Sequence, residues 1–194
     1  MRNAEDDIAP LPVLFEKTDE CPMEDKPEIL FSPEDRIIDH IMDEFLSARR
    51  TIDIVVFLIG SKRVANTLVK AHKNGAAVRM IIDGKVGRRR FSKHKFLLKR
   101  GIEVKTIRVS RGSMHSKFIL IDGEKLIAGS ANLTNDANYR NHEFIFVSKD
   151  QKIIEPFTVK FEEMWAMSKK QTSRSVKRKG KERGGLGGEW YIRI

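Results

Sequence analysis

Two runs of β-branched apolar residues, separated by a stretch of helical periodicity, constrain the fold of this chain most strongly. Residues 51–58 and 77–83 have the composition of buried strands. Between them, Val64, Leu68 and Val69 recur at helical spacing. A strand, a helix and a second strand in this order are typical of an α/β protein.

The rest of the chain adds a hairpin and further helices. Asp122-Gly123 suits a tight turn and separates two short apolar runs, which predicts a β-hairpin. The pattern therefore predicts an α/β fold with a mixed β-sheet flanked by helices. We further expect helices beginning at Ser32-Pro33, ending before Gly101 and covering 153–167, and strands over 102–109, 117–121, 125–128 and 143–147.

Charge divides the 194 residues into three parts. Residues 1–28 hold nine acidic and three basic side chains and are expected to form a mobile N-terminal arm. Residues 29–167 contain all the predicted elements and form the expected folded domain. Residues 168–194 are rich in Lys and Arg and then in Gly, which predicts a disordered basic tail.

Composition excludes several classes of protein. Cys21 is the only cysteine, so an internal disulfide scaffold is excluded. No apolar run reaches the roughly 18 residues of a transmembrane span, so we expect no stable membrane insertion. The first residues do not resemble a secretory signal, and a cytoplasmic protein is therefore expected.

A long basic run indicates a polyanionic partner. The chain carries a net charge of +10, and residues 84–100 contain eight basic side chains without an acidic one. Such a run either faces solvent without a function or binds phosphates, and we favour the second interpretation. The nucleic-acid-binding residues that we predict here are Lys85, Arg88, Arg89, Arg90, Lys93 and Lys95.

One segment, HSKFILIDGEKLIAGSAN at residues 115–132, carries a pattern suited to phosphate chemistry. His115 and Lys117 are two residues apart at the start of a predicted strand, so both side chains can point to one face. The hairpin brings Ser130 and Asn132 back beside them. Lysine, serine and asparagine donate hydrogen bonds to phosphate oxygens, and histidine can attack phosphorus. Because an ammonium group in the cluster repels cations, we expect neither a metal nor another cofactor.

This segment resembles the HKD motif of the phospholipase D superfamily, with Asp122 and Gly129 as motif positions that we expect to be structural. The resemblance extends over about residues 31–165 and is greatest to the small endonucleases that carry one motif. It implies a phospholipase D/nuclease-like fold. It also implies that Glu143, in Asn141-His142-Glu143, accepts a hydrogen bond from the nucleophilic histidine.

The superfamily uses two copies of the motif, and this chain contains one, so the resemblance implies a homodimer that shares one active site. We expect a metal-independent endonuclease, nonspecific or structure-selective, that forms a phosphohistidine and acts on DNA more readily than on RNA. A hydrolase of cardiolipin-type phospholipids with the same chemistry is one alternative. A basic DNA-binding module without catalytic activity is the other.

Overall fold

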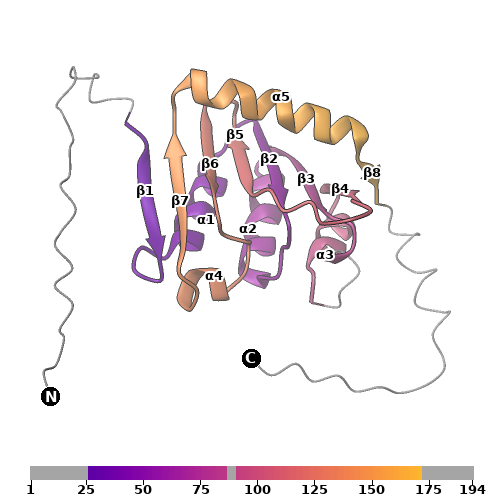
Figure 1. Ribbon diagram of the computed structural model, residues 1–194, viewed down its shortest axis with the longest axis horizontal. Helices are drawn as coiled ribbons and strands as arrows, with labels where there is room; N and C mark the ends of the chain where they lie inside the picture. The colour runs from indigo at the N-terminus through magenta and orange to yellow at the C-terminus, as the bar shows by residue number, and fades with distance from the viewer. Residues whose placement is uncertain (1–25, 87–90, 172–194) are drawn as a thin grey trace, which may run out of the picture.

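The computed structural model describes residues 26–86 and 91–171 of the chain. Eight strands form one sheet in the order β1-β7-β6-β5-β2-β3-β4-β8 (Figure 1). The elements are β1 (Glu28–Ser32), α1 (Ile37–Ser47), β2 (Thr51–Val56), α2 (Lys62–Lys73), β3 (Ala77–Asp83), α3 (His94–Lys99), β4 (Glu103–Ile107), β5 (Phe118–Ile121), β6 (Lys125–Gly129), α4 (Asp136–Tyr139), β7 (Glu143–Ser148), α5 (Gln151–Met167) and β8 (Lys169–Lys170).

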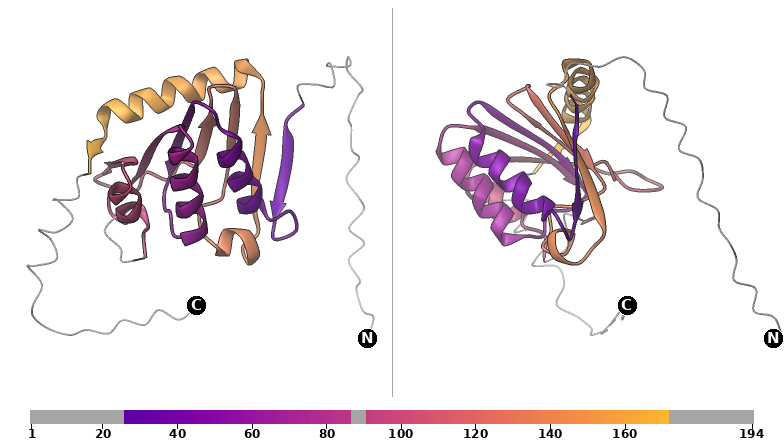
Figure 2. Two further views of the ribbon diagram at one scale, coloured as in Figure 1. Left: turned by 180° about the vertical axis from the view of Figure 1, so that it is seen from behind. Right: turned by 90° about the vertical axis from the view of Figure 1, so that its left-hand side faces the viewer.

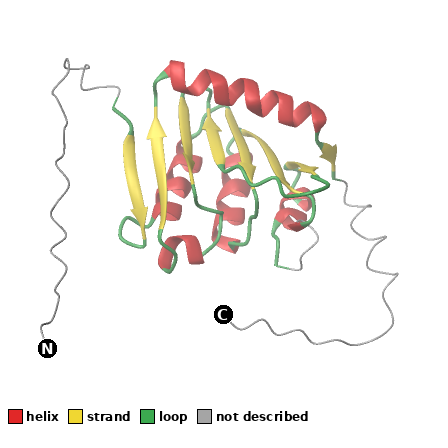
Figure 3. Cartoon of the chain, viewed as in Figure 1, coloured by secondary structure: helices red, strands yellow, loops and turns green. Residues whose placement is uncertain are grey.

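The sheet is mixed, as the sequence predicts. Strands β2, β3 and β4 are parallel and are joined by α2 and α3 (Figure 3). From β2 outward, the pairs β2–β5, β5–β6, β6–β7 and β7–β1 are all antiparallel. The predicted α/β class is therefore confirmed, and the hairpin turns at Asp122-Gly123, where both residues adopt positive φ angles.

Helices cover the two faces of the sheet unequally. One apolar cluster packs α1, α2 and α3 against the sheet, with Phe45, Ile54 and Leu68 fully buried in it. A second, smaller cluster packs Phe161 and Met164 of α5 against the opposite face (Figure 2). Both faces bury apolar side chains, which explains the near-continuous apolar runs of β2 and β3.

The largest error of the sequence interpretation lies at the start of the domain. Ser32 ends strand β1 instead of capping a helix, and α1 begins only at Ile37. Strand β1 pairs with β7, so that Phe31 lies opposite Phe144. A partner 113 positions away leaves no local signal, and the strand was therefore missed.

Parts of the predicted three-part division lie outside the described residues. Most of the expected acidic arm, 1–28, and of the expected basic tail, 168–194, is not described. At their inner ends, Glu28 opens β1, and Lys169 and Lys170 pair with β4. The proposed boundaries and the mobility of the two ends stay predictions.

Candidate active site

The first two residues of the motif lie together where the chain enters β5. Nζ of Lys117 lies 2.9 Å from Nδ1 of His115 and donates to the His115 carbonyl oxygen at 2.7 Å. The imidazole is exposed, whereas Lys117 is half-buried. An imidazole open to solvent beside an ammonium group is well placed to meet a phosphate.

The end of β6 brings the second half of the motif to the same edge. The backbone N–H of Gly129 donates to the carbonyl oxygen of Lys117 at 3.3 Å. A Cβ at Gly129 would lie 2.1 Å from the carbonyl oxygen of Phe144, so only glycine allows β6 and β7 to approach this closely. This approach places Ser130 next to the start of β7.

Hydrogen bonds from neighbouring strands hold the last two motif side chains. Oγ of Ser130 donates to Glu143 Oε2 at 2.5 Å and accepts from the N–H of Phe144 at 3.1 Å. Oδ1 of Asn132 accepts from the N–H of Leu58, just beyond β2, at 3.2 Å. The structure thus brings the four polar motif side chains to one edge of the sheet.

Glu143 lies in the site, but its contacts differ from those that the resemblance implies. Its second oxygen accepts a hydrogen bond from Asn141 Nδ2 at 3.1 Å, so both carboxylate oxygens have partners on or beside β6 and β7. The structure does not show the expected contact with His115 within one chain. The His115 ring instead lies against Phe57, with centroids 4.9 Å apart.

The electrostatic surroundings of Lys117 are unusual for a lysine. Burial lowers its pKa, and the negative charge of Glu143 opposes this effect only in part, so the pKa stays below its ordinary value. Within the described residues, no carboxylate lies within ion-pair distance of its ammonium group. A phosphate entering the site would supply the missing negative charge.

Asp122 anchors the hairpin to the rest of the sheet. Its carboxylate accepts hydrogen bonds from the backbone N–H groups of Arg49, Arg50 and Thr51, at 2.7 to 2.9 Å. Burial raises the pKa of Asp122, but these three hydrogen bonds and the charge of Arg50 outweigh it and leave the pKa below its ordinary value. This geometry is that of a structural residue at the sheet end remote from the motif side chains.

The predicted nucleic-acid-binding run is only partly visible. Lys85 is exposed, and its Nζ donates to the carbonyl oxygen of Gly112 at 2.8 Å, so it connects two loops. Lys93 and Lys95 are half-buried, and the N–H of Lys93 donates to the Ile59 carbonyl oxygen at 2.9 Å, near the site. The other predicted residues, Arg88, Arg89 and Arg90, lie outside the described residues.

Two further residues belong to the site and were missed by sequence reasoning. Phe57 contacts the His115 ring, and Asp83 accepts a hydrogen bond from the N–H of Met114, the residue before His115. An aspartate that ends a mostly apolar strand was a signal for Asp83. Nothing in the sequence pattern distinguishes Phe57 from an ordinary strand residue.

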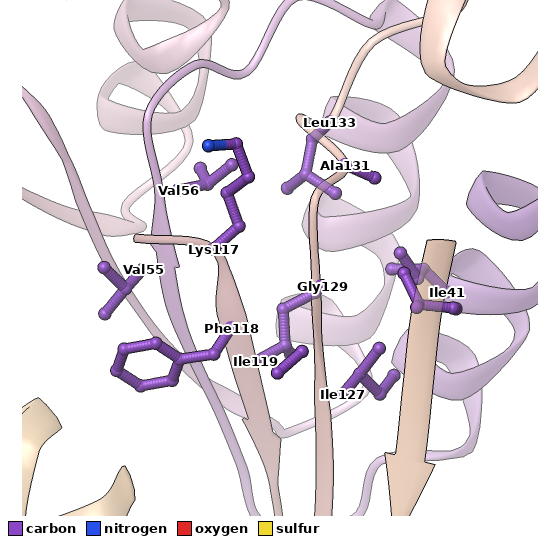
Figure 4. A pocket seen from close by; sticks show the side chains of 12 residues that line it. Ile41, Val55, Val56, Lys117, Phe118, Ile119, Ile127, Gly129, Ala131 and Leu133 are labelled. Carbon is purple, nitrogen blue, oxygen red and sulfur yellow. The ribbon is translucent and has the colours of Figure 1, made fainter. Parts of the chain in front are cut away.

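The space beneath the motif is small and apolar. A cavity of about 20 Å³ is lined by Lys117 and by apolar residues of α1 and the neighbouring strands. In Figure 4 the lysine nitrogen points away from Phe118 and Ile119. A cavity of this size holds at most about one water molecule, so it has no room for an acyl chain.

Among the described residues, no three His, Cys, Asp or Glu side chains converge in a way that would hold a metal ion. Within 26–86 and 91–171, none of the helices combines the length and apolar character required to cross a bilayer.

The family comparison identifies the proteins that share this arrangement. Residues 41–165 match the family described as "Cardiolipin synthase, PLD-like domain", and the match spans more than half of the chain. This chain belongs to the phospholipase D superfamily. The family resemblance carried by the motif is thereby confirmed.

Relatives within the phospholipase D superfamily carry two kinds of name. The mitochondrial cardiolipin hydrolase of Danio rerio is 31% identical over 148 residues, covering 76% of this chain and 62% of that protein. A phospholipase D of Rickettsia prowazekii is 30% identical over 146 residues, covering 75% of this chain and 68% of that protein. The chain thus spans about three fifths of the length of the first relative.

Solved structures of the superfamily confirm the fold. Nuc from Salmonella typhimurium, a phospholipase D family member, superimposes with a TM-score of 0.70 at 24% identity, over 77% of this chain and 100% of Nuc. NucT from Helicobacter pylori superimposes with a TM-score of 0.71 at 19% identity, over 76% of this chain and 100% of NucT. The predicted phospholipase D/nuclease-like domain is therefore correct as a fold.

Proposed function

We propose that this chain is a metal-independent phosphodiesterase that acts as an endonuclease, nonspecific or selective for nucleic acid structure. The convergence of His115, Lys117, Ser130 and Asn132 at one sheet edge is the observation that carries this proposal. It combines a nucleophile with donors for phosphate oxygens and does not require a metal ion.

The chemistry requires a second imidazole, which a homodimer supplies. One ring nitrogen of His115 attacks phosphorus, and the bond from phosphorus to the leaving oxygen breaks. The partner subunit's His115 gives its proton to that oxygen. It then takes a proton from water, whose oxygen attacks phosphorus and breaks the phosphorus–nitrogen bond. One phosphodiester and one water thus give one phosphomonoester and one hydroxyl group.

An exposed apolar strip beside the site supports the dimer. Ile29, Phe31 and Phe144 are 56%, 55% and 44% exposed. Phe31 and Phe144 are paired across β1 and β7, and the N–H of Phe144 contacts Ser130. A second copy that brings its histidine to this site would also cover the strip, which is costly to leave in water.

The surroundings of the site favour nucleic acid as the substrate. In addition to the basic run, two arginines, Arg108 and Arg111, are exposed on the loop that leads to His115. Cations on two loops beside the site suit a chain of phosphates and predict a steep loss of binding with added salt. TrmBL2, described as an archaeal chromatin protein with a novel mode of DNA binding, has a similar fold, with a TM-score of 0.55 at 18% identity over 78% of this chain and 56% of TrmBL2.

A phospholipid headgroup is the second candidate substrate. The relatives named mitochondrial cardiolipin hydrolase favour it, because they share about 30% of the matched sequence. The small cavity beneath Lys117 has no room for a lipid tail.

One assay separates these possibilities. Purified protein is incubated in excess EDTA with single- and double-stranded DNA and RNA, and with cardiolipin vesicles. The proposal predicts cleavage of nucleic acid, with DNA preferred, and no cleavage by His115→Asn. Hydrolysis of cardiolipin without cleavage of nucleic acid would identify the phospholipid as the substrate. Activity that requires added Mg²⁺ would refute the metal-independent mechanism. Binding of DNA without cleavage would favour the alternative of a DNA-binding module without catalytic activity.

A further inference from the structure

A buried aspartate connects the two loops that meet beside the nucleophile. Asp83 is the last residue of β3, and its exposed fraction is 0%. Oδ1 accepts hydrogen bonds from the N–H groups of Lys85 and Val86 at 2.8 and 2.9 Å. Oδ2 accepts from the N–H of Met114 at 3.1 Å. Each carboxylate oxygen thus holds a different loop.

The second of these loops carries the nucleophile. Residues 108–117 leave the end of β4 and project from the sheet face opposite α1 and α2, as the right-hand view of Figure 2 shows. Residues 110–113 and His115 are exposed, whereas Met114 is 5% exposed. Met114 is therefore the buried anchor of this loop, one residue before the imidazole, and Asp83 holds its backbone.

A second contact joins the same two loops from the surface. Nζ of Lys85 donates to the carbonyl oxygen of Gly112 at 2.8 Å. The N–H of Gly84 also donates to the Ile107 carbonyl oxygen at 2.7 Å, where the second loop begins. These contacts lie on both sides of the Asp83 carboxylate and leave the loop with His115 little freedom relative to β3.

We propose that Asp83 is a positioning residue that fixes His115 for in-line attack, a role that rests on the proposed function. Asp83 does not touch the reacting atoms. A displacement of about 1 Å in a reacting group costs about a hundredfold in rate, so a single anchor next to the nucleophile has a large effect on turnover.

The geometry requires a carboxylate and not its amide. A carboxylate presents two accepting oxygens, and here both accept from backbone N–H groups. Asparagine presents one accepting oxygen and one NH₂ group, which would face an N–H on one of the two loops. The amide oxygen satisfies two N–H groups when it faces Lys85 and Val86, so the NH₂ group then faces the N–H of Met114. Asp83→Asn therefore releases the loop that carries His115, while it preserves the shape of the side chain.

The test uses a small substrate, bis(p-nitrophenyl) phosphate, which is too short to contact the basic loops. In full-length Asp83→Asn we expect kcat to fall about a hundredfold with KM within about twofold. Asp53→Asn is the matched control, since Asp53 is also a buried aspartate but pairs with Arg79 at 2.7 Å under α5. It should lose stability and keep kcat. Equal kcat in wild type and Asp83→Asn would overturn the proposal.

Two additional measurements also test the proposed role of Asp83. The backbone amide of Met114 should exchange with solvent much faster in Asp83→Asn than in wild type, and unchanged protection would overturn the proposal even if the protein cleaves no diester. Should Asp83→Asn not fold, Lys85→Met removes the surface contact between the same loops. It should lower kcat on the small diester by about tenfold with unchanged KM, and an unchanged kcat would contradict the proposal.

Discussion

Arg79 and Lys117 are two partly buried cations of one sheet, and their surroundings differ in kind. Arg79 on β3 pairs with Asp53 and Glu162, each at 2.7 Å, and lies over the rings of Phe161 and Trp165. The hydrogen bond with Asp53 raises the pKa of Arg79 above its ordinary value, although burial opposes it.

Lys117 shows the opposite arrangement. Its hydrogen-bond partners are the ring and the carbonyl oxygen of His115, and burial lowers its pKa although the charge of Glu143 opposes this. Within the described residues, the fold therefore neutralises one cation and gives the other no carboxylate within ion-pair distance. The first charge stabilises the protein, and we propose that the second binds a phosphate. This comparison suggests four tests.

The largest effect is expected at the histidine that Lys117 contacts. His115→Asn removes the nucleophile and leaves the cation and the polar donors in place. Cleavage should fall by about 10⁴-fold or more, while substrate binding stays close to that of wild type. Single-turnover cleavage and equilibrium binding measure the two quantities. Cleavage within tenfold of wild type would remove His115 from the mechanism.

Exchanging each cation for methionine tests the comparison itself. Lys117→Met should lower kcat/KM by about 10²- to 10³-fold, because it removes the charge that faces the phosphate. The same change should not destabilise the fold, since the half-buried ammonium group has no carboxylate within ion-pair distance among the described residues.

Arg79→Met is the matched variant in the structural region. It should lower the free energy of unfolding by about 1–3 kcal/mol, because it leaves Asp53 without its partner, and it should keep kcat/KM. Denaturant melts and initial rates on both proteins provide the measurement. The reverse pattern would show that the two cations have been assigned the wrong roles.

His94 offers a third case, a basic group that burial keeps neutral. Burial, with help from the charge of Lys95, lowers its pKa to about 4, and its Nδ1 lies 2.9 Å from Ser92 Oγ. The folded pKa is below the unfolded value of 6.5, so the stabilising effect is complete above pH 6.5 and is lost as pH falls toward 4.

This shift corresponds to about 3 kcal/mol between pH 7 and pH 4. Urea denaturation at several pH values should show that wild type loses about this much more stability than His94→Gln over this range. Parallel curves for the two proteins would show that folding does not lower the pKa of His94.

The smallest effect is expected from Glu143→Gln. The negative charge of Glu143 raises the pKa of Lys117, so replacing Glu143 with neutral glutamine should lower the pKa of Lys117 further. The alkaline limb of the profile of kcat/KM against pH should move to lower pH, with a loss of about fivefold at neutral pH. An unmoved alkaline limb would mean that Lys117 does not titrate in that limb.

The sequence predicted the features that depend on neighbouring residues. The β-branched run 77–83 forms β3 over those residues, and the Asp-Gly dipeptide turns the hairpin that brings the motif halves together. Both follow from local rules of strand composition and turn geometry. The mixed sheet and the motif cluster were predictable for that reason.

The features that were missed depend on contacts distant in sequence. Strand β1 exists because Phe31 pairs opposite Phe144, and Asp83 matters because it reaches Met114. The partners of Glu143 also depend on how closely Gly129 lets β6 approach β7. Local periodicity contains no information about such pairs, so only the folded chain shows them.

The central claim, that two copies of this chain share one active site, is tested most directly by mixing. Wild type and His115→Asn are unfolded together, refolded in varying ratios and assayed at constant total protein. A shared site predicts that activity falls with the square of the wild-type fraction, because only dimers with two histidines complete the reaction. Activity that falls in direct proportion to that fraction would contradict the account.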